Sequence, residues 1–586
     1  MHSLDWIVLI LTLTATIAYG LYKSRTAHSL DGYILSNRSM NWGLILLSII
    51  GTQASAITFI SAPGQAYTDG MRFVQYYFGL PLAAIVVCIF FVPIFSKLKV
   101  YTAYEYLETR FDVKTRTLTS LLFLLNRGLS TGISVFAPSI ILSSLFGWNI
   151  YWTNLFMGGL LIIYTVTGGA KAVAYTQQLQ LIIIFTGMFL AAYLVVKMLP
   201  DDIGFFDALH VSGKLGKLNV ITTGIKDGKF DWNDRYNLLS GIIGGFFLSL
   251  SYFGADQSQV GRYLTGSSVK ESRLGLLMNG VVKVPMQFLI LLIGALVFTF
   301  YQFHKAPIFF NDTQITRLEN SAYKDSFSIA QAQYLLITKE KREAIARFST
   351  ALDSKEENDI TKKTDELRRL QQSSDSLRGK VTKWIKKSGG DDNDTNYIFL
   401  RFVVDYLPAG LVGLLIAIIF LASWGSIAAA LHSLSSCTMI DFHKRFSKRS
   451  IEPAKEYQWS RWYTLGWGVF CIVVAMFTYN IGNSLIEAVN VLGSLFYGVI
   501  LGVFLVAFFL KKIKNGLAVF LGALLAECLV LTVFALVKLG YFQLGFLWLN
   551  PIGAFGVILF SSVFHFILRN RQSQNPSMRP DSSREQ

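Results

Sequence analysis

The sequence predicts an all-α membrane protein with about thirteen transmembrane helices. Hydrophobic residues make up 52% of the 586 residues and charged residues only 15%, whereas soluble domains carry about 25% charged residues. The apolar residues gather in long runs, and a run of about 20 residues spans a bilayer as a helix. The basic residues are concentrated in alternate connections between these runs, as expected for a multi-pass protein.

Thirteen runs meet the length requirement. They cover residues 4–22, 41–66, 73–97, 117–146, 150–168, 173–199, 237–257, 273–303, 397–436, 460–480, 484–510, 515–539 and 546–568. The first run is predicted to be an anchor and not a cleaved signal peptide. The leading residues MHSLDW carry no positive charge, and the basic residues Lys23 and Arg25 follow the run.

The placement of charge predicts an outside N-terminus and a cytoplasmic C-terminus. The connections after odd-numbered runs hold most of the basic residues, among them Lys97, Lys99, Arg110, Lys114, Arg116, Lys511, Lys512 and Lys514. The short connections on the other side hold little beyond Arg72. Because this positive-inside pattern accounts for the net charge of +16, we expect no nucleic-acid partner. We expect a multi-pass protein of the plasma (cytoplasmic) membrane, in contact with the lipid bilayer.

The second run carries polar residues where a lipid-facing helix would carry Leu and Val. Its stretch GTQASAITFISAPG, residues 51–64, places Thr52, Gln53, Ser55 and Thr58 inside the span. The ASA triplet and the APG turn weaken helical continuity, so we predict a broken helix. Irregular backbone at membrane depth is tolerated where it lines a cavity, so Gln53, Ser55 and Thr58 are candidates for lining a substrate cavity.

A second break is predicted in the seventh run, 237–257, which Gly245 and Gly254 loosen. Tyr252 and Phe253 supply aromatic faces suited to gating. The two broken runs are five apart, which predicts two five-helix repeats of inverted topology.

These features divide the chain into six parts. They are an N-terminal anchor helix with the first cytoplasmic loop (1–40), a first five-helix repeat (41–199), an extracytoplasmic loop (200–236), a second five-helix repeat (237–510), two extra C-terminal helices (511–568) and a disordered cytoplasmic tail (569–586). The second repeat contains a helical extracytoplasmic insert at 304–396, where Leu367, Leu377 and Val381 belong to a heptad-like apolar stripe. We expect the insert to pack on itself as a helical hairpin, with recruitment of an outer partner or of substrate as the alternative.

Polar and ionisable groups inside a membrane mark candidate pathways. Ser426 lies on a small-residue face of the run 397–436, and its hydroxyl can act as an oxygen ligand for a monovalent cation. Close helix packing is the alternative explanation of that face.

Four charged residues of the spans need partners. Arg127 can pair with a substrate carboxylate or with an internal acid, and Lys283 can hydrogen-bond a substrate or brace the bundle. Asp256 and Arg262 are expected to form a structural ion pair. No phosphate-binding loop and no catalytic or metal-ligand spacing is visible, so the sequence predicts neither an enzyme nor an ATP-driven pump.

Several motifs together resemble the sodium/solute symporter family (sodium/glucose cotransporter-like), whose members transport sugars, proline, iodide, monocarboxylates, vitamins and sialic acids. The resemblance covers about residues 40 to 510. It rests on ASAITFISAPGQAYTDG (54–70), TAYEYLETRF (102–111), TGISVFAPSIIL (131–142), YTVTGGAKAVAYTQQLQ (164–180), FGADQSQVGRYL (253–264) and the segment 422–441. It implies the inverted-repeat fold, secondary active transport and coupling to Na+.

The resemblance also implies a sodium site made by the carbonyls of Gly51, Ala54 and Ala422 and the hydroxyl of Ser426. The family often has two adjacent hydroxyl residues there, but the first is Gly425 in this chain, so its oxygen must come from backbone or water. Members with a second sodium site use an Asp where this chain has Thr176-Gln177-Gln178, and hydroxyls near positions 428–429, which are Ala here. One sodium per cycle is therefore expected.

The resemblance leaves the substrate class less defined. The positions that contact sugar in sugar-carrying members read Ile57, Thr58, Tyr77, Leu80, Ser249, Lys283 and Asn490. The two acidic positions among them have become Ile57 and Tyr77, which removes acceptors for sugar hydroxyls. Arg127 lies near the position of an arginine that sialic-acid carriers use for a carboxylate.

We therefore expect a sodium-coupled symporter that imports a small organic solute by alternating access, with a carboxylate or other anion as substrate. A neutral sugar or polyol is the alternative substrate. A transporter-derived sensor or scaffold, with the 304–396 insert contacting an outer partner, is the alternative of a different class.

Overall fold

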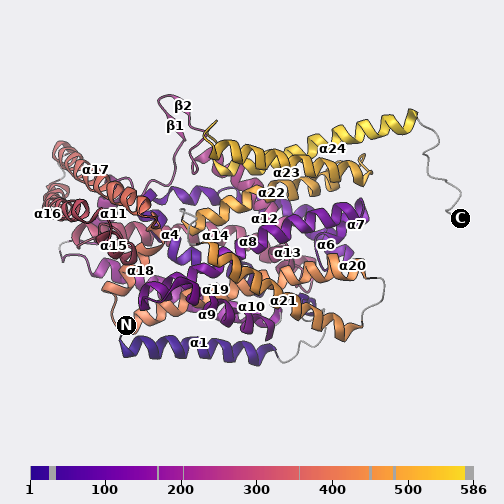
Figure 1. Cartoon of the computed structure of the whole chain (residues 1–586), viewed down its shortest axis with the longest axis horizontal. Coiled ribbons are helices and arrows are strands. Elements are labelled where there is room, and N and C mark those ends of the chain that lie inside the picture. Colours follow the sequence, from indigo (N-terminus) through magenta and orange to yellow (C-terminus); the bar gives the residue numbers. More distant parts are fainter. Residues whose placement is uncertain are drawn as a thin grey trace.

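The computed structural model shows long helices running side by side along one axis (Figure 1). The structure describes residues 2–24, 34–167, 170–201, 203–354, 357–447, 452–478 and 484–574. Within these ranges, ten helical stretches are long and apolar enough to cross a membrane, and one bent pair makes an eleventh. The prediction of an all-α, multi-pass membrane protein is confirmed.

The described residues of the first half of the chain form fourteen helical segments. They are α1 (Ser3–Ser24), η1 (Ser36–Arg38), α3 (Trp42–Gln53), α4 (Ala56–Asp69), η2 (Met71–Tyr77), α5 (Leu80–Val86), the π-helix η3 (Val87–Phe91), α6 (Val92–Leu98), α7 (Glu105–Arg110), α8 (Val113–Phe146), α9 (Ile150–Thr167), α10 (Ala170–Lys197), α11 (Phe205–Lys214) and the π-helix η4 (Ser240–Gly244). The only strands in the described part of the chain are β1 (Ile225–Lys226) and β2 (Lys229–Phe230), which pair antiparallel.

The second half continues the bundle. Its helices are α12 (Gly245–Gly254), α13 (Gln257–Tyr263), α14 (Val269–Phe303), α15 (Asp312–Glu319), α16 (Lys324–Ser354), α17 (Glu357–Lys387), α18 (Thr395–Tyr406), α19 (Leu411–Cys437), the π-helix η5 (Thr438–His443), α20 (Lys444–Phe446), α21 (Pro453–Phe477), α22 (Leu485–Phe509), α23 (Gly516–Lys538), η7 (Phe546–Trp548) and α24 (Leu549–Gln574). The predicted disordered tail began at residue 569, but α24 ends at Gln574. Residues 575–586 of that tail lie outside the described residues.

Burial separates the central helices from the peripheral ones. Of the 18 most apolar consecutive residues in the membrane-length stretch that contains α19, 94% are buried. The same share is 78% for α22 and 72% for α8. The corresponding share is 22% for α1 and 33% for α24. An apolar helix that leaves most of its surface uncovered needs an apolar solvent. We therefore assign α19, α22 and α8 to the centre and α1 and α24 to the lipid boundary.

The predicted break in the second apolar run is present. α3 ends at Gln53, α4 begins at Ala56, and the two axes differ by 62°. Ser55 is extended, with φ −81° and ψ 170°. Its amide donates to the carbonyl of Gln53 at 3.0 Å, two residues back and not four, so the helical hydrogen-bond ladder stops here.

The second half of the broken helix is held at very short range by its neighbours. A Cβ atom on Gly64 of α4 would lie 1.9 Å from the carbonyl oxygen of Thr395 at the start of α18. A Cβ atom on Gly294 of α14 would lie 2.1 Å from the carbonyl oxygen of Pro63. Only glycine permits these approaches, so α14 and α18 fix the direction of α4 beyond the break.

The two ends of the bundle differ. The pair α16–α17, which we call the hairpin, lies at one end together with α11, α15 and the N-terminus (Figure 1). We call this the hairpin end. The short helices α7 and α20 lie at the opposite end (Figure 1).

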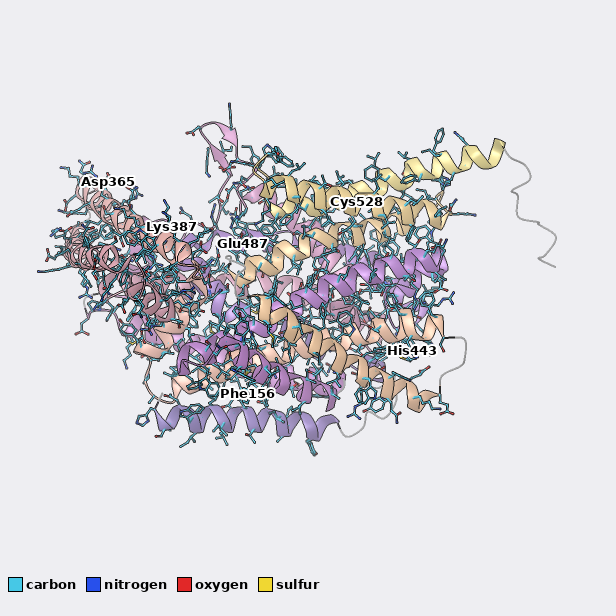
Figure 2. All side chains as sticks on the ribbon, in the orientation of Figure 1. Phe156, Asp365, Lys387, His443, Glu487 and Cys528 are labelled. Atoms are coloured by element: carbon cyan, nitrogen blue, oxygen red, sulfur yellow. The ribbon has the colours of Figure 1, made fainter. Side chains whose placement is uncertain are left out.

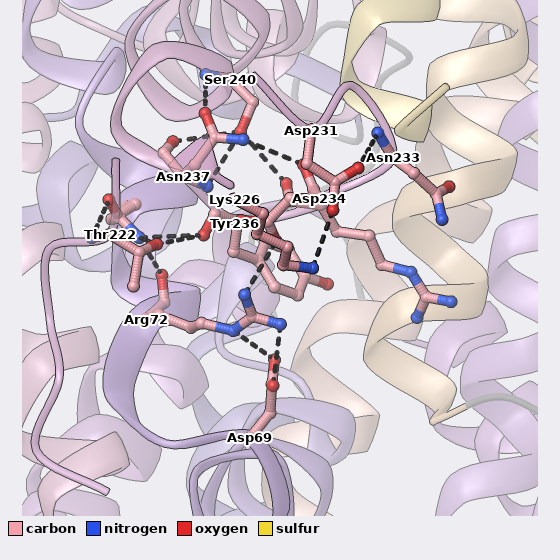
Figure 3. Close-up of polar contacts among 12 residues, drawn as sticks. Asp69, Arg72, Thr222, Lys226, Asp231, Asn233, Asp234, Tyr236, Asn237 and Ser240 are labelled. Carbon is pink, nitrogen blue, oxygen red and sulfur yellow. Dashed lines mark hydrogen bonds and ion pairs between the residues drawn. The ribbon is translucent and has the colours of Figure 1, made fainter. Parts of the chain in front are cut away.

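An ion-pair network ties the loop before α12 to the end of α4. Arg72 pairs with Asp69 at 2.9 Å and with Asp234 at 2.8 Å (Figure 3). Gln75 exchanges hydrogen bonds with Thr222 of the same loop at 3.0 and 3.1 Å. The network fixes η2, the segment that ends in Tyr76 and Tyr77.

The substitution Gly64→Ala is expected to destabilise the protein. The added methyl group overlaps a backbone oxygen that cannot move alone, and overpacking of this kind lowers the free energy of unfolding by about 1–3 kcal/mol. Gly466→Ala on α21 is the matched control, because a Cβ atom there meets nothing within 4 Å. Thermal unfolding of the purified protein in detergent measures both; equal stability of the two variants would contradict the close α4–α18 packing.

Candidate functional site

A cavity of about 150 Å³ lies at the centre of the bundle, beside the break between α3 and α4. We call it the central cavity. Its walls come from α3, α4, η2, α5, α8, α12, α14, α19 and α22. These segments are far apart in sequence, so only the packed bundle brings them together.

The structure brings together every predicted substrate and gate residue at this cavity. The lining includes Gln53, Ser55, Thr58, Tyr77, Arg127, Ser249, Lys283 and Asn490 together with Tyr252 and Phe253. Ile57 and Leu80 line it as well.

Several lining residues were missed from the sequence. Ser130, Thr131 and Ser134 line the cavity from the turns of α8 that follow Arg127. Counted from Arg127, they recur at spacings of three and four residues, which places them on one helix face, a signal that could have identified them. Tyr76 and Tyr497 also line the cavity; as aromatic residues in apolar runs they gave no such signal.

Arg127 is neutralised inside the protein. Its guanidinium forms an ion pair with Asp256 and donates to the hydroxyl of Tyr497 at 3.1 Å. The Tyr497 hydroxyl donates in turn to Asp256 at 2.6 Å. The Arg127 guanidinium also lies 5.4 Å from the ring centroid of Tyr252, in cation–π range. Of the two roles expected for Arg127, the structure shows pairing with an internal acid.

The expected ion pair between Asp256 and Arg262 is wrong. Asp256 precedes α13 and accepts from the amide of Ser258 at 2.8 Å, so it caps that helix. This position at the break between α12 and α13 turns its second carboxylate oxygen toward Arg127 on α8. Sequence spacing could not identify a partner 129 residues away.

Lys283 is the cation of the central cavity that lacks a protein anion. It is 1% exposed, and among the described residues its ammonium group forms no hydrogen bond or ion pair. The ring centroid of Tyr77 lies 5.6 Å from its Nζ atom. A buried ammonium group without an anion is strongly unfavourable, so this position calls for a negatively charged ligand.

Other polar groups line the same cavity. Tyr76 donates to the side-chain oxygen of Asn490 at 3.1 Å, and the amide nitrogen of Asn490 has no partner among the described residues. Gln53 donates to Asn279 at 3.1 Å. Glu487 of α22 does not line the cavity: it pairs with Arg235 and lies toward the hairpin end (Figure 2).

The predicted sodium ligands lie on α3, at the break that follows it, and on α19. Ser426 lines the central cavity, and its hydroxyl contacts the carbonyl of Ala422 at 3.0 Å. Gly51, Ala54, Ala422 and Gly425 are not among the lining residues.

Two glutamine side chains of α10 fill the space between α3 and α19. Gln177 donates to the carbonyl of Gly425 at 3.0 Å and to Thr52 at 3.3 Å, and it accepts from Ser48 at 3.0 Å. A Cβ atom on Gly51 would lie 2.8 Å from the Cβ atom of Gln177. Gln177 therefore touches both helices that carry the predicted ligands.

The second glutamine occupies the place of the missing side chain at position 425. The carboxamide oxygen of Gln180 lies 2.6 Å from the point where a Gly425 Cβ atom would be. Gln180 is 2% exposed, and its amide nitrogen has no partner among the described residues. The sequence expectation was a backbone or water oxygen here; the structure places a side-chain oxygen there.

Comparisons with known proteins identify the family of the chain. The sequence model of the sodium:solute symporter family matches residues 33–323 and 378–526. The chain is 25% identical over 565 residues to the sodium/sialic acid symporter SiaT of Proteus mirabilis (strain HI4320), covering 96% of this chain and 94% of that protein. It is 25% identical over 546 residues to the sodium/sialic acid symporter NanT of Aliivibrio fischeri (strain ATCC 700601 / ES114), covering 93% and 90%.

A solved structure shares the fold. It is the substrate-bound, outward-open state of a Na+-coupled sialic acid symporter, with a TM-score of 0.72 and 23% sequence identity over 97% of this chain and 98% of that chain.

The substitution Asp256→Asn is expected to destabilise the protein strongly. It leaves Arg127 charged and without a counter-ion, which lowers the free energy of unfolding by about 3–5 kcal/mol for a buried pair. The double variant Asp256→Asn/Arg127→Gln should recover most of this loss. Asp69→Asn is the control, because its pair with Arg72 is partly exposed and is worth about 0–1 kcal/mol. Additive losses in the double variant would show that the two side chains do not interact.

Proposed function

The chain belongs to the sodium:solute symporter family, and we propose that it imports a small organic anion by alternating access, together with one sodium ion per cycle. Coupling to sodium is a property of the family that the chain belongs to. Its relatives are named as transporters, and we propose no enzymatic activity.

The observation that carries the anionic substrate is Lys283. Its ammonium group lines the central cavity at 1% exposure without an anion, while the neighbouring cation Arg127 already has Asp256. A bound carboxylate would supply the missing charge through a charge-assisted hydrogen bond. A neutral sugar or polyol, the alternative substrate, would leave this charge unbalanced.

The remaining walls suit a hydroxylated acid. Ser130, Thr131 and Ser134 on α8, and Asn490 with its unpartnered amide nitrogen, lie on other faces of the same cavity. Hydroxyl and amide groups can both donate and accept hydrogen bonds. We therefore propose an acidic sugar or a similar hydroxylated carboxylic acid, in agreement with the sialic acid that the relatives' names record.

The sodium site is proposed between the α3–α4 break and α19. Its ligands would be the carbonyls of Gly51, Ala54 and Ala422 and the hydroxyl of Ser426. The carboxamide oxygen of Gln180 would replace the side chain that Gly425 lacks, because it lies where that side chain would begin. Carbonyl, hydroxyl and amide oxygens are ligands suited to hard cations.

We propose one sodium per cycle because the positions that the family resemblance implies for a second site lack an acid and hydroxyl groups in this chain. Position 177 is a neutral glutamine, and its amide nitrogen donates to the carbonyl of Gly425 and to the hydroxyl of Thr52. Ala428 and Ala429 offer no hydroxyl groups on α19.

Thirteen transmembrane helices remain our proposal for the span count. In the described part of the chain, the ten long stretches, the bent pair α3–α4 and the two shorter apolar helices at 150–163 and 240–254 account for this number. In that count α3–α4 form the second span and η4–α12 the seventh, five positions apart, as an inverted repeat of five helices with the predicted boundaries 41–199 and 237–510 would require.

The N-terminus is proposed to be outside and the C-terminus in the cytoplasm. The basic helix α20 (Lys444–Phe446) lies at the end opposite the hairpin (Figure 1). The positive-inside rule assigns that end to the cytoplasmic side of the plasma membrane. The loop 200–236 and the insert 304–396 then lie outside.

Uptake into proteoliposomes tests the substrate class. The panel contains labelled monocarboxylates, acidic sugars, neutral sugars, amino acids and halides, each with and without a sodium gradient. We expect sodium-driven uptake of an acid and not of its neutral analogue; uptake of neutral sugars alone would overturn the proposal.

The substitution Lys283→Met is expected to raise the KM for the acid by ~10- to 100-fold, because a hydrogen bond to a charged group contributes about 1.5–3 kcal/mol. Lys283→Arg should retain more of the affinity. Lys538→Met, at an exposed lysine of α23, is the control and should transport normally. An unchanged preference for acid over neutral analogue in Lys283→Met would show that another group binds the anion.

The substitutions Ser426→Ala and Gln180→Leu are expected to raise the sodium concentration for half-maximal uptake by ~10-fold, since each removes one oxygen ligand. The Hill slope for sodium should stay near one. Ser433→Ala, which removes a buried hydroxyl further along α19 that is bonded to Ala429, is the control. Undiminished sodium dependence in both variants would count against the proposed ion site.

A further inference from the structure

A second polar cavity, of about 140 Å³, lies between the hairpin and the transporter core. We call it the hairpin cavity. Its floor comes from α4, α14 and the loop after α11, and its roof from α16 and α17. It shares no lining residue with the central cavity. A single water needs about 10–15 Å³, so this space accommodates a polyatomic ligand.

The roof lies mostly outside the family match. The matched residues stop at 323 and resume at 378, so α16 and most of α17 are not covered. The hairpin nevertheless packs on the core, because Ala344, Phe348 and Leu367 form a buried apolar cluster with Val211 of α11. In Figure 2, Asp365 and Lys387 of the hairpin lie at the end of the molecule away from His443.

Two ammonium groups meet in the hairpin cavity from opposite sides. Lys217 comes from the core and donates to the carbonyl of Thr68 at 2.6 Å. Lys341 comes from α16, is 8% exposed and donates to the side-chain oxygen of Gln371 at 2.6 Å. Among the described residues, neither ammonium group lies within ion-pair distance of a carboxylate.

The other charges of the cavity leave an excess of positive charge. Arg378 is paired with Asp394 at 2.8 Å. Asp375 is the one carboxylate among the lining residues, and it accepts from Gln371 at 2.8 Å. Two ammonium groups therefore face a single acid.

Two further observations indicate a missing ligand. Burial, opposed by the charge of Asp375 and reinforced by the positive charges of Arg378 and Lys217, lowers the pKa of Lys341 to about 8. The hydroxyl of Tyr301, which lines the same cavity at 2% exposure, has no hydrogen-bond partner among the described residues. An anion would reduce the repulsion between the ammonium groups and could accept from the hydroxyl.

We propose that the hairpin cavity binds a small anion, either a carboxylate or an inorganic anion of similar size, between Lys217 and Lys341. The bound anion joins a core cation to a hairpin cation and so fastens the hairpin to the core. This inference does not depend on which solute the central cavity carries.

The test is 19F NMR line broadening of trifluoroacetate, a small carboxylate, by the full chain in detergent. The Lys283→Met background removes the proposed anion contact of the central cavity. Adding Lys341→Met or Lys217→Met should weaken the apparent affinity by ~10-fold, because each removes a charged hydrogen-bond donor. Adding Asp375→Asn should strengthen it, since this removes the only lining carboxylate. Lys339→Met, an exposed lysine on the same helix, is the matched control and should change nothing.

Competition separates the two sources of anion. Displacement of trifluoroacetate by acetate and not by chloride or phosphate identifies a carboxylate site, and displacement by chloride or phosphate identifies an inorganic-anion site. The anion that competes should also raise the thermal unfolding midpoint of the Lys283→Met protein and do so less in the variant that also carries Lys341→Met. Broadening that is unaffected by Lys341→Met, Lys217→Met and Asp375→Asn would overturn the proposal, whatever the uptake assays show for the central cavity.

Discussion

A charge buried at membrane depth must be balanced by another charge, and the central cavity follows from this constraint. Arg127 satisfies it inside the protein through Asp256 and Tyr497. Lys283 does not satisfy it within the described residues, although it is 1% exposed. Two cations of one cavity therefore have different roles. The paired one joins α8 to the break between α12 and α13, and we propose that the unpaired one selects an anionic solute.

The broken helix is the second condition on which the site depends. At the end of α3 the amide of Ser55 donates to the carbonyl of Gln53, and the helical hydrogen-bond pattern stops. Backbone carbonyl groups at this break can therefore bind a ligand at membrane depth. α10 contributes Gln177 and Gln180 to the space between α3 and α19. Position 177, for which the family resemblance implies an aspartate, is a neutral glutamine. The carboxamide oxygen of Gln180 lies beside Gly425. The same polar packing that closes the bundle therefore also shapes the proposed sodium site.

The sequence was sufficient for features that depend on local pattern. Small and polar residues in an apolar run predicted the break at Ala54–Ser55, and a resemblance identified cavity positions on six segments. Features that depend on packing between distant segments were not predictable. Asp256 forms an ion pair with Arg127 on α8, and the Gln180 oxygen occupies the space beside Gly425. Lys217 of the core and Lys341 of the hairpin line one cavity. Each of these pairs joins segments of the chain whose relative placement no single run of residues specifies.

The central claim is that one sodium ion enters with one organic anion, which makes each transport cycle electrically neutral at a pH where the acid is ionised. Charge movement during sodium-driven uptake, recorded on a solid-supported membrane alongside the labelled flux, tests this claim directly. The account predicts labelled acid accumulating with the sodium gradient, no sustained transport current and no dependence of the flux on membrane potential. A steady inward positive current that follows the flux would contradict it, because that current requires either a second sodium ion or a neutral solute.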